Sequence, residues 1–387
     1  SGDLEELSSD LTLIGQGVAA TNVGDNDTIV TGSGDDVALG GYGSDYINVT
    51  NDSNRTAIAD TGNDILVGDN ATAIFNATLI EGSNARQDRI TTIATFHGNN
   101  DYIYSSLGKD ILLGGQGIDI LDSGSGDAQD TDILGDIILG DMGQATFATN
   151  GNGRIDNLKL IQVTSLATSN SVGGGDIITS GKGRDVVLGG NASDTINTHA
   201  GNDVVVGDSG KATFNPNNNQ LVDIKTIDPT QGAADTIHTH AGHDTVLGGA
   251  GGDAIDTADG NDIVLGDNGQ ATFDISERLE WIQTSDPSVG DSDHLLLGEG
   301  NDEYSYEEAD RGDDVANFLR GSRLDCGDVS VETTRDLTSC STSIEERWRL
   351  AEKSGDISSA QSLCEALTDD VPACQVAVDQ DERNGAN

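Results

Sequence analysis

Aspartate recurs every nine residues along most of this chain, and that period limits the fold more than any other feature. All but two of these aspartates have Ile, Leu or Val two positions later. Repeats this short bury their apolar side chains by stacking on one another. The series comprises Asp27, Asp36, Asp45, Asp64, Asp101, Asp110, Asp119, Asp136, Asp176, Asp185, Asp194, Asp203, Asp235, Asp244, Asp253, Asp262, Asp293 and Asp302, with the register slipped by about one residue at the fourth and eighth members.

The charge of the chain requires a cationic partner. There are 67 acidic and 19 basic side chains, for a formal net charge of −48, so the bare chain repels itself. This balance excludes nucleic acid as a partner and disfavours anionic membranes. Carboxylate and carbonyl oxygens suit the hard cation Ca²⁺. No stretch approaches the roughly 18 apolar residues of a membrane span, so none is expected.

The purest copies of the repeat read GGYGSDYIN (40–48), GGQGIDILD (114–122) and GGAGGDAID (248–256). They resemble the G-G-x-G-x-D-x-U-x nonapeptide of the hemolysin-type, or repeats-in-toxin (RTX), calcium-binding family. Each position has a physical role. Glycines allow positive φ and turn carbonyls inward; the aspartate supplies carboxylate oxygen; one aliphatic side chain fills the interior of a three-residue strand.

This resemblance implies an all-β, right-handed parallel β-roll with several Ca²⁺ ions between successive turns. Aspartates 18 residues apart would share an ion, as in Asp27/Asp45, Asp101/Asp119, Asp176/Asp194, Asp185/Asp203, Asp235/Asp253 and Asp244/Asp262. The other predicted ligands are Asp36, Asp64, Asp110 and Asp136. Sites are expected to be weak or absent where Asn54 or Ala128 stands one coil from an aspartate. The alternative is that these aspartates only cap turns.

A longer period groups the nonapeptides in fours. Each group closes with a related segment, GDNATAIF (68–75), GDMGQATF (140–147), GDSGKATF (207–214) or GDNGQATF (266–273), followed by a second alternating run. This pattern predicts an inserted β-hairpin in each group. Because four nonapeptides make two coils, we expect the hairpins to join into one extra sheet. That sheet should cover a row of turns, with Phe75, Phe147, Phe214 and Phe273 in its seam.

The pattern also predicts domain boundaries: a partial N-terminal cap (1–22), a β-roll (23–306) and a C-terminal capping module (307–387). The roll divides into super-repeats 23–97, 98–172, 173–232, 233–290 and 291–306, all but the last with a hairpin. The C-terminal module is expected to be α-helical, with two disulfides. Neighbours in sequence favour the pairs Cys326–Cys340 and Cys364–Cys374, and a zinc site is the rival interpretation.

Known catalytic motifs are missing from the sequence, which contains no His-Glu-x-x-His, no Gly-x-Ser-x-Gly and no phosphate-binding loop. We therefore expect a protein that is not an enzyme. The cluster of His199, His238, His240 and His243 is interpreted as exposed turn residues, with a transition-metal site as the alternative. The tripeptide 311–313 reads Arg-Gly-Asp, a weak adhesion signal.

Two functional hypotheses remain. The first is an extracellular calcium-binding structural or adhesive protein, assembling head to tail with itself or with components of a cell surface or matrix. The second is a non-catalytic secretion and folding module of a larger secreted enzyme, toxin or adhesin. Both imply secretion, or display on a bacterial surface, because a chain that needs abundant Ca²⁺ would fold outside the cell. The hairpin inserts, the cysteine-bearing tail and the ending DQDERNGAN favour the first hypothesis.

Overall fold

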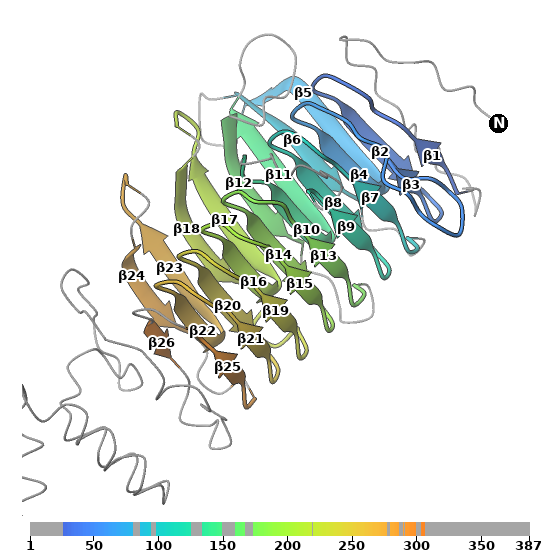
Figure 1. Cartoon of the computed structure of the whole chain (residues 1–387). Coiled ribbons are helices and arrows are strands. Elements are labelled where there is room, and N and C mark those ends of the chain that lie inside the picture. Colours follow the sequence, from blue (N-terminus) through green and yellow to red (C-terminus); the bar gives the residue numbers. More distant parts are fainter. Residues whose placement is uncertain are drawn as a thin grey trace, which may run out of the picture.

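The computed structural model describes a roll of short β-strands (Figure 1). Every named element within the described residues is a β-strand, as the sequence predicted. The described residues are 26–79, 86–93, 98–124, 134–148, 159–166, 173–218, 220–276, 279–285, 289, 291–298 and 303–305.

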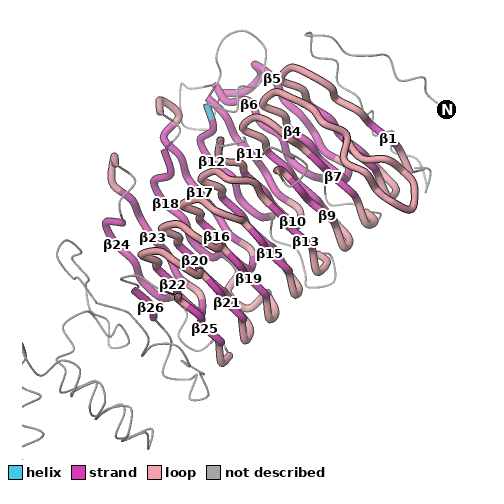
Figure 2. The backbone as a smooth tube through the Cα atoms, in the orientation of Figure 1, coloured by secondary structure: helices cyan, strands magenta, loops and turns pink. Residues whose placement is uncertain are grey.

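Two parallel sheets form the body of the roll, and each coil contributes one strand to each sheet. The outer sheet contains β1 (Thr28–Ile29), β3 (Tyr46–Ile47), β7 (Tyr102–Tyr104), β9 (Ile120–Asp122), β13 (Ile177–Thr179), β15 (Thr195–Asn197), β19 (Thr236–His238), β21 (Ala254–Asp256) and β25 (His294–Leu296). The middle sheet contains β2 (Val37–Gly41), β4 (Ile65–Asp69), β8 (Ile111–Gly115), β10 (Ile137–Asp141), β14 (Val186–Gly190), β16 (Val204–Asp208), β20 (Thr245–Gly249), β22 (Ile263–Asp267) and β26 (Glu303–Ser305). The alternation of strand and turn along the chain is visible in Figure 2.

A third, antiparallel sheet is built from the four inserted hairpins, and we call it the hairpin sheet. Its strands pair within each hairpin and also from one hairpin to the next, as when β11 pairs with both β6 and β12. The prediction that the hairpins join into one sheet is confirmed. In chain order its strands are β5 (Ala71–Leu79), β6 (Arg86–Thr92), β11 (Gly143–Ala148), β12 (Leu160–Ser165), β17 (Gly210–Asn215), β18 (Gln220–Thr226), β23 (Gly269–Phe273) and β24 (Leu279–Thr284).

The hairpin sheet lies against the middle sheet, not over a row of turns, so that part of the prediction is wrong. Side chains of the middle sheet, such as those of Leu139 and Leu188, pack in one buried cluster with Phe147, Phe214 and Phe273. The side chain of Phe75 is outside the described set. Each of those three phenylalanines follows a register shift in its hairpin, and their mutual stacking stays a prediction.

The middle sheet is therefore buried on both faces. Its strands read as apolar runs such as Val186-Val187-Leu188, where alternate residues face opposite layers. Val187 packs toward the outer sheet with Ile178 and Ile196, whereas Leu188 packs toward the hairpins. The sequence prediction of one interior aliphatic per strand holds for the outer sheet and is wrong for the middle one.

The remaining sequence predictions are not decided by these sheets. The N-terminal cap before residue 23 and the capping module after residue 306, including Cys326, Cys340, Cys364 and Cys374, lie outside the described residues, as does the Arg-Gly-Asp tripeptide. The right-handed turn of the roll, inferred from family resemblance, stays a prediction.

Candidate metal centre

The turns of the roll form two edges with different sequences. We call the glycine edge the side where the chain passes from the middle to the outer sheet, through tight turns such as 40–45 or through a hairpin. Gly41 and Gly43 have φ of 112° and 129°, the positive values expected for this turn. We call the opposite side the hydroxyl edge, because six of its turns begin with Ser or Thr and end with Asp five residues later. These turns are 31–36, 105–110, 180–185, 198–203, 239–244 and 257–262.

The glycine edge carries one aspartate per coil, and these side chains form a continuous ladder. Each backbone N–H donates to Oδ1 of the aspartate in the next coil, at 2.7 to 2.9 Å. Pairs 18 residues apart alternate with pairs separated by a hairpin. The ladder comprises Asp27, Asp45, Asp101, Asp119, Asp176, Asp194, Asp235, Asp253 and Asp293.

The hydroxyl edge has a matching ladder, with N–H to Oδ1 distances of 2.7 to 3.0 Å. It comprises Asp36, Asp64, Asp110, Asp136, Asp185, Asp203, Asp244 and Asp262. All sixteen aspartates predicted as metal ligands therefore lie in one of the two ladders.

The expected gaps at Asn54 and Ala128 do not break the ladder. Asp64 accepts from the N–H of Asp36 at 2.8 Å, and Asp136 accepts from that of Asp110 at 2.8 Å. The chain makes a longer excursion in each of these coils and then returns an aspartate to the same place. Counting a fixed 18 residues missed this, because loop length can change while the coil register is kept.

For seven aspartates of the glycine edge, the second carboxylate oxygen has no hydrogen-bond partner. The Oδ2 atoms of Asp45, Asp101, Asp119, Asp176, Asp194, Asp235 and Asp253 are buried and unpaired. Burial, together with the nearby carboxylates of Asp69 and Asp45, raises the pKa of Asp101 to about 9. Burial likewise raises the pKa of Asp235 to about 8, with help from Asp208. An anionic oxygen placed here without a cation is costly.

Glycine leaves an open cradle around each of these oxygens. A Cβ added to Gly189 would lie 2.6 Å from Oδ2 of Asp194 and would also meet the carbonyl oxygen of Gly207 in the next coil. A Cβ added to Gly114 would likewise lie 2.5 Å from Oδ2 of Asp119 and meet the Gly140 carbonyl oxygen. Carboxylate and carbonyl oxygens therefore converge in a space that any other side chain would fill, and that donor set fits Ca²⁺.

Sequence reasoning missed four aspartates at the roots of the hairpins: Asp69, Asp141, Asp208 and Asp267. Asp141 accepts from the N–H groups of Asn191 at 2.5 Å and Gly174 at 3.2 Å, so it ties the hairpin root to two neighbouring turns. Burial raises the pKa of Asp141 to about 7. The signal was present, since every closing segment begins with Gly-Asp, but these residues lie outside the nine-residue register.

Within the described residues, no group of three His, Cys, Asp or Glu side chains converges to hold a metal ion. Each ladder position instead offers carboxylates from one column together with turn carbonyls. His199, His240 and His243 lie in turns of the hydroxyl edge, with the rings of His199 and His240 stacked at 5.8 Å. This arrangement lends no support to the transition-metal alternative.

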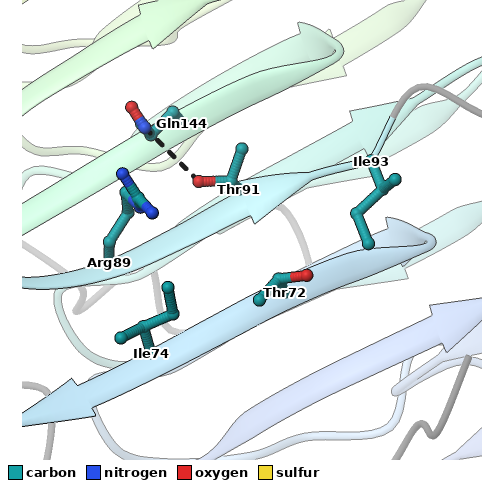
Figure 3. Close-up of a pocket in the computed structure, with 6 residues that line it drawn as sticks. All are labelled: Thr72, Ile74, Arg89, Thr91, Ile93 and Gln144. Carbon is teal, nitrogen blue, oxygen red and sulfur yellow. Dashed lines mark hydrogen bonds between the residues drawn. The ribbon is translucent and has the colours of Figure 1, made fainter. Parts of the chain in front are cut away.

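A pocket lies on the hairpin sheet (Figure 3). Its lining includes Arg89 on β6 and Gln144 on β11, and Gln144 Nε2 donates to Thr91 Oγ1 at 3.3 Å. Its six lining residues include one ionisable side chain, so the candidate site stays with the aspartate ladders.

Comparison with known proteins agrees with this geometry. The family model of the RTX calcium-binding nonapeptide repeat matches four times, over residues 22–55, 98–128, 171–211 and 231–264. These four segments are therefore RTX calcium-binding repeats, and repeats of this kind bind several Ca²⁺ ions. No curated protein and no solved structure matches the chain. Among the described residues, no helix is long and apolar enough to cross a membrane.

Proposed function

We propose that this chain is a secreted, non-catalytic structural protein, made rigid by Ca²⁺ outside the cell and able to associate end to end or with a surface or matrix. The observation that supports calcium binding is the column of buried, unpaired Oδ2 atoms on the glycine edge. The ladder aspartates and the turn carbonyls would hold the ions. The bound ions would neutralise carboxylates that otherwise repel across the roughly 4.8 Å spacing of the coils.

Secretion follows from the amount of calcium that the ladders would require. A chain with seven unpaired, buried carboxylate oxygens on one edge folds most readily where Ca²⁺ is abundant. Binding to the folded state alone stabilises that state by mass action, so stability should rise with the concentration of free Ca²⁺.

End-to-end association is supported by the open ends of the parallel sheets. Within the described residues, β1 and β2 at one end and β25 and β26 at the other each pair on one side only. Unpaired strand edges invite pairing with another chain, and a stack of coils offers the same kind of edge at both ends.

The test is the mass of the purified chain by light scattering, first in millimolar Ca²⁺ and then in excess chelator. Large, elongated species that form only with Ca²⁺ would support the proposal. A compact monomer that merely unfolds on chelation would contradict the assembly and favour the secretion and folding module instead.

A pair of variants locates the contact. Thr28→Lys places a charge on the end strand β1, and Thr236→Lys places the same charge on the internal strand β19, where Thr236 is also exposed. Charged side chains blunt a strand edge. We expect Thr28→Lys to reduce assembly and Thr236→Lys to leave it unchanged; equal behaviour of the two would rule out assembly through β1.

A further inference from the structure

The second carboxylate oxygen of the ladder aspartates has different surroundings at two positions of the hydroxyl edge than on the glycine edge. On the glycine edge, Oδ2 of Asp194 is buried and unpaired. On the hydroxyl edge, Oδ2 of Asp203 accepts from Thr198 Oγ1 at 2.7 Å, and Oδ2 of Asp185 accepts from Ser180 Oγ at 2.5 Å. A hydroxyl therefore already occupies the place of a cation at these two positions.

At these positions the difference comes from the first residue of the turn. Glycine stands at that position on the glycine edge, as Gly189 does before Asp194, and it leaves the cradle empty. On the hydroxyl edge the equivalent residues are Ser180 and Thr198, five residues before their aspartates, and their side chains fill it. At these positions the difference lies in the sequence of the turn, which reads GGNASD at 189–194 but SGKGRD at 180–185 and THAGND at 198–203.

The carbonyl oxygens differ in the same way. The Ser180 carbonyl oxygen, which corresponds to those that face the glycine cradles, lies 2.8 Å from Nδ1 of His199. The Thr198 carbonyl oxygen accepts from Ser180 Oγ at 3.2 Å. The carboxylate and carbonyl oxygens on this stretch of the hydroxyl edge already contact protein groups. An ion would have to displace those groups.

The hairpin roots add further carboxylates to the glycine edge. Asp141 accepts from the N–H groups of Asn191 and Gly174, and Asp208 Oδ1 accepts from that of Ala233, all in turns of this edge. These two roots therefore place a second carboxylate beside the ladder.

We propose that Ca²⁺ binds along the glycine edge and that the hydroxyl edge, at Asp185 and Asp203, is closed by the hydroxyls of Ser180 and Thr198 in place of the ion. This inference rests on the calcium binding of the proposed function and not on its end-to-end assembly. The ions then lie beside the hairpin roots, and at these two coils the opposite edge is held by side-chain hydrogen bonds.

The test compares Asp194→Asn with Asp203→Asn in the full chain. Asparagine keeps the Oδ1 acceptor that each ladder uses, so both variants retain the N–H bond from the coil before. Calcium bound per chain at saturation is measured by elemental analysis after dialysis, with titration calorimetry for affinity. We expect Asp194→Asn to lose one or two ions and Asp203→Asn to lose none. Equal losses would overturn the proposal.

A gain of binding gives an independent measurement. Thr198→Gly opens the cradle at Asp203 and should add one ion per chain, whereas an unchanged count would argue against the role of the hydroxyl. Should a variant fail to fold, anomalous scattering from Tb³⁺ in crystals of the unaltered chain decides, because Tb³⁺ beside Asp203 would contradict the proposal. If the unaltered chain binds no Ca²⁺ at all, the proposed function itself fails.

Discussion

The interior of the roll and its two edges differ in how their stability depends on the ions and protons of the solution. The interior is filled by aliphatic side chains such as Leu112 and Val187, packed in layers that need nothing from solvent. The edges bury carboxylates such as Asp119 and Asp194, whose second oxygens have no hydrogen-bond partner. The fold therefore has a fully packed interior but uncompensated negative charge at its edges. Calcium ions and protons, more than buried apolar area, decide whether it forms.

The largest effect should come from removing calcium at neutral pH. If the charge of the edges controls folding, excess chelator at pH 7.5 abolishes the β signal in far-ultraviolet circular dichroism, because the ladder carboxylates are left to repel one another. Restoring Ca²⁺ should restore the signal. A chain that keeps its β signal in chelator would show that the interior suffices by itself.

Acid should replace calcium in part. Burial raises the pKa of Asp45 to about 7 and, together with neighbouring carboxylates, those of Asp101 and Asp203 to about 9. A raised folded-state pKa contributes stability that is present below the unfolded value of 3.8 and is lost as pH rises toward 7 to 9.

The calcium-free chain is thus expected to be most stable near pH 4 and to unfold as pH increases. A pH series of circular dichroism in chelator measures this. The calcium-loaded chain is the control and should follow the reverse trend, since protons compete with the ion for the same oxygens. Unfolding of the calcium-free chain on acidification would contradict the assignment of buried, uncompensated carboxylates.

Truncating buried side chains on either face of the middle sheet should lower the stability of the roll. Ile138 packs toward the outer sheet and Leu139 toward the hairpins, and both are fully buried. In saturating Ca²⁺, Ile138→Ala and Leu139→Ala should each lower the free energy of unfolding by about 2–5 kcal/mol, measured by denaturant titration. Ile177→Ala on the outer sheet is the control, because Ile177 is 46% exposed and should cost no more than about 0.5 kcal/mol. A small cost for Leu139→Ala would show that the hairpin sheet does not pack tightly.

The smallest expected effect lies on the exposed face of the outer sheet. Arg55 lies over the ring of Tyr102, with 3.8 Å between its guanidinium carbon and the ring centroid, and Tyr102 stacks on Tyr46 at 5.1 Å. Arg55→Ala should lower the free energy of unfolding by about 0.5–1 kcal/mol, the usual worth of an exposed cation–π contact. Arg55→Lys is the matched control and should recover part of that loss; identical stability of all three proteins would show that the contact contributes nothing.

The hairpin sheet shows how far sequence reasoning reached. The closing segments and alternating runs predicted four hairpins, and their two-coil spacing predicted that they would join. The face that they cover could not be deduced from spacing alone. The signal was the third apolar residue of the middle strands, such as Leu139 and Leu188, because a strand buried on both faces loses its alternation.

The two ladders show the same limit. Their members follow from the nine-residue period, yet Asp64 and Asp136 fall out of register in a count along the chain, because loops interrupt the count. Asp141 and Asp208 lie outside the nine-residue period, since they follow the strand and precede a hairpin. Only the stacking of coils reveals that residues far apart in sequence, such as Asp119 and Asp176, are adjacent in the ladder.

The sequence by itself determined the repeat, its demand for a hard cation and the existence of the hairpins, because these depend on local spacing, turn chemistry and net charge. The tertiary structure alone decided which layer the hairpins cover and which carboxylate oxygens are left without a partner. Both are outcomes of contacts between coils, where a glycine or a hydroxyl at one turn position decides whether a buried oxygen faces open space or a donor.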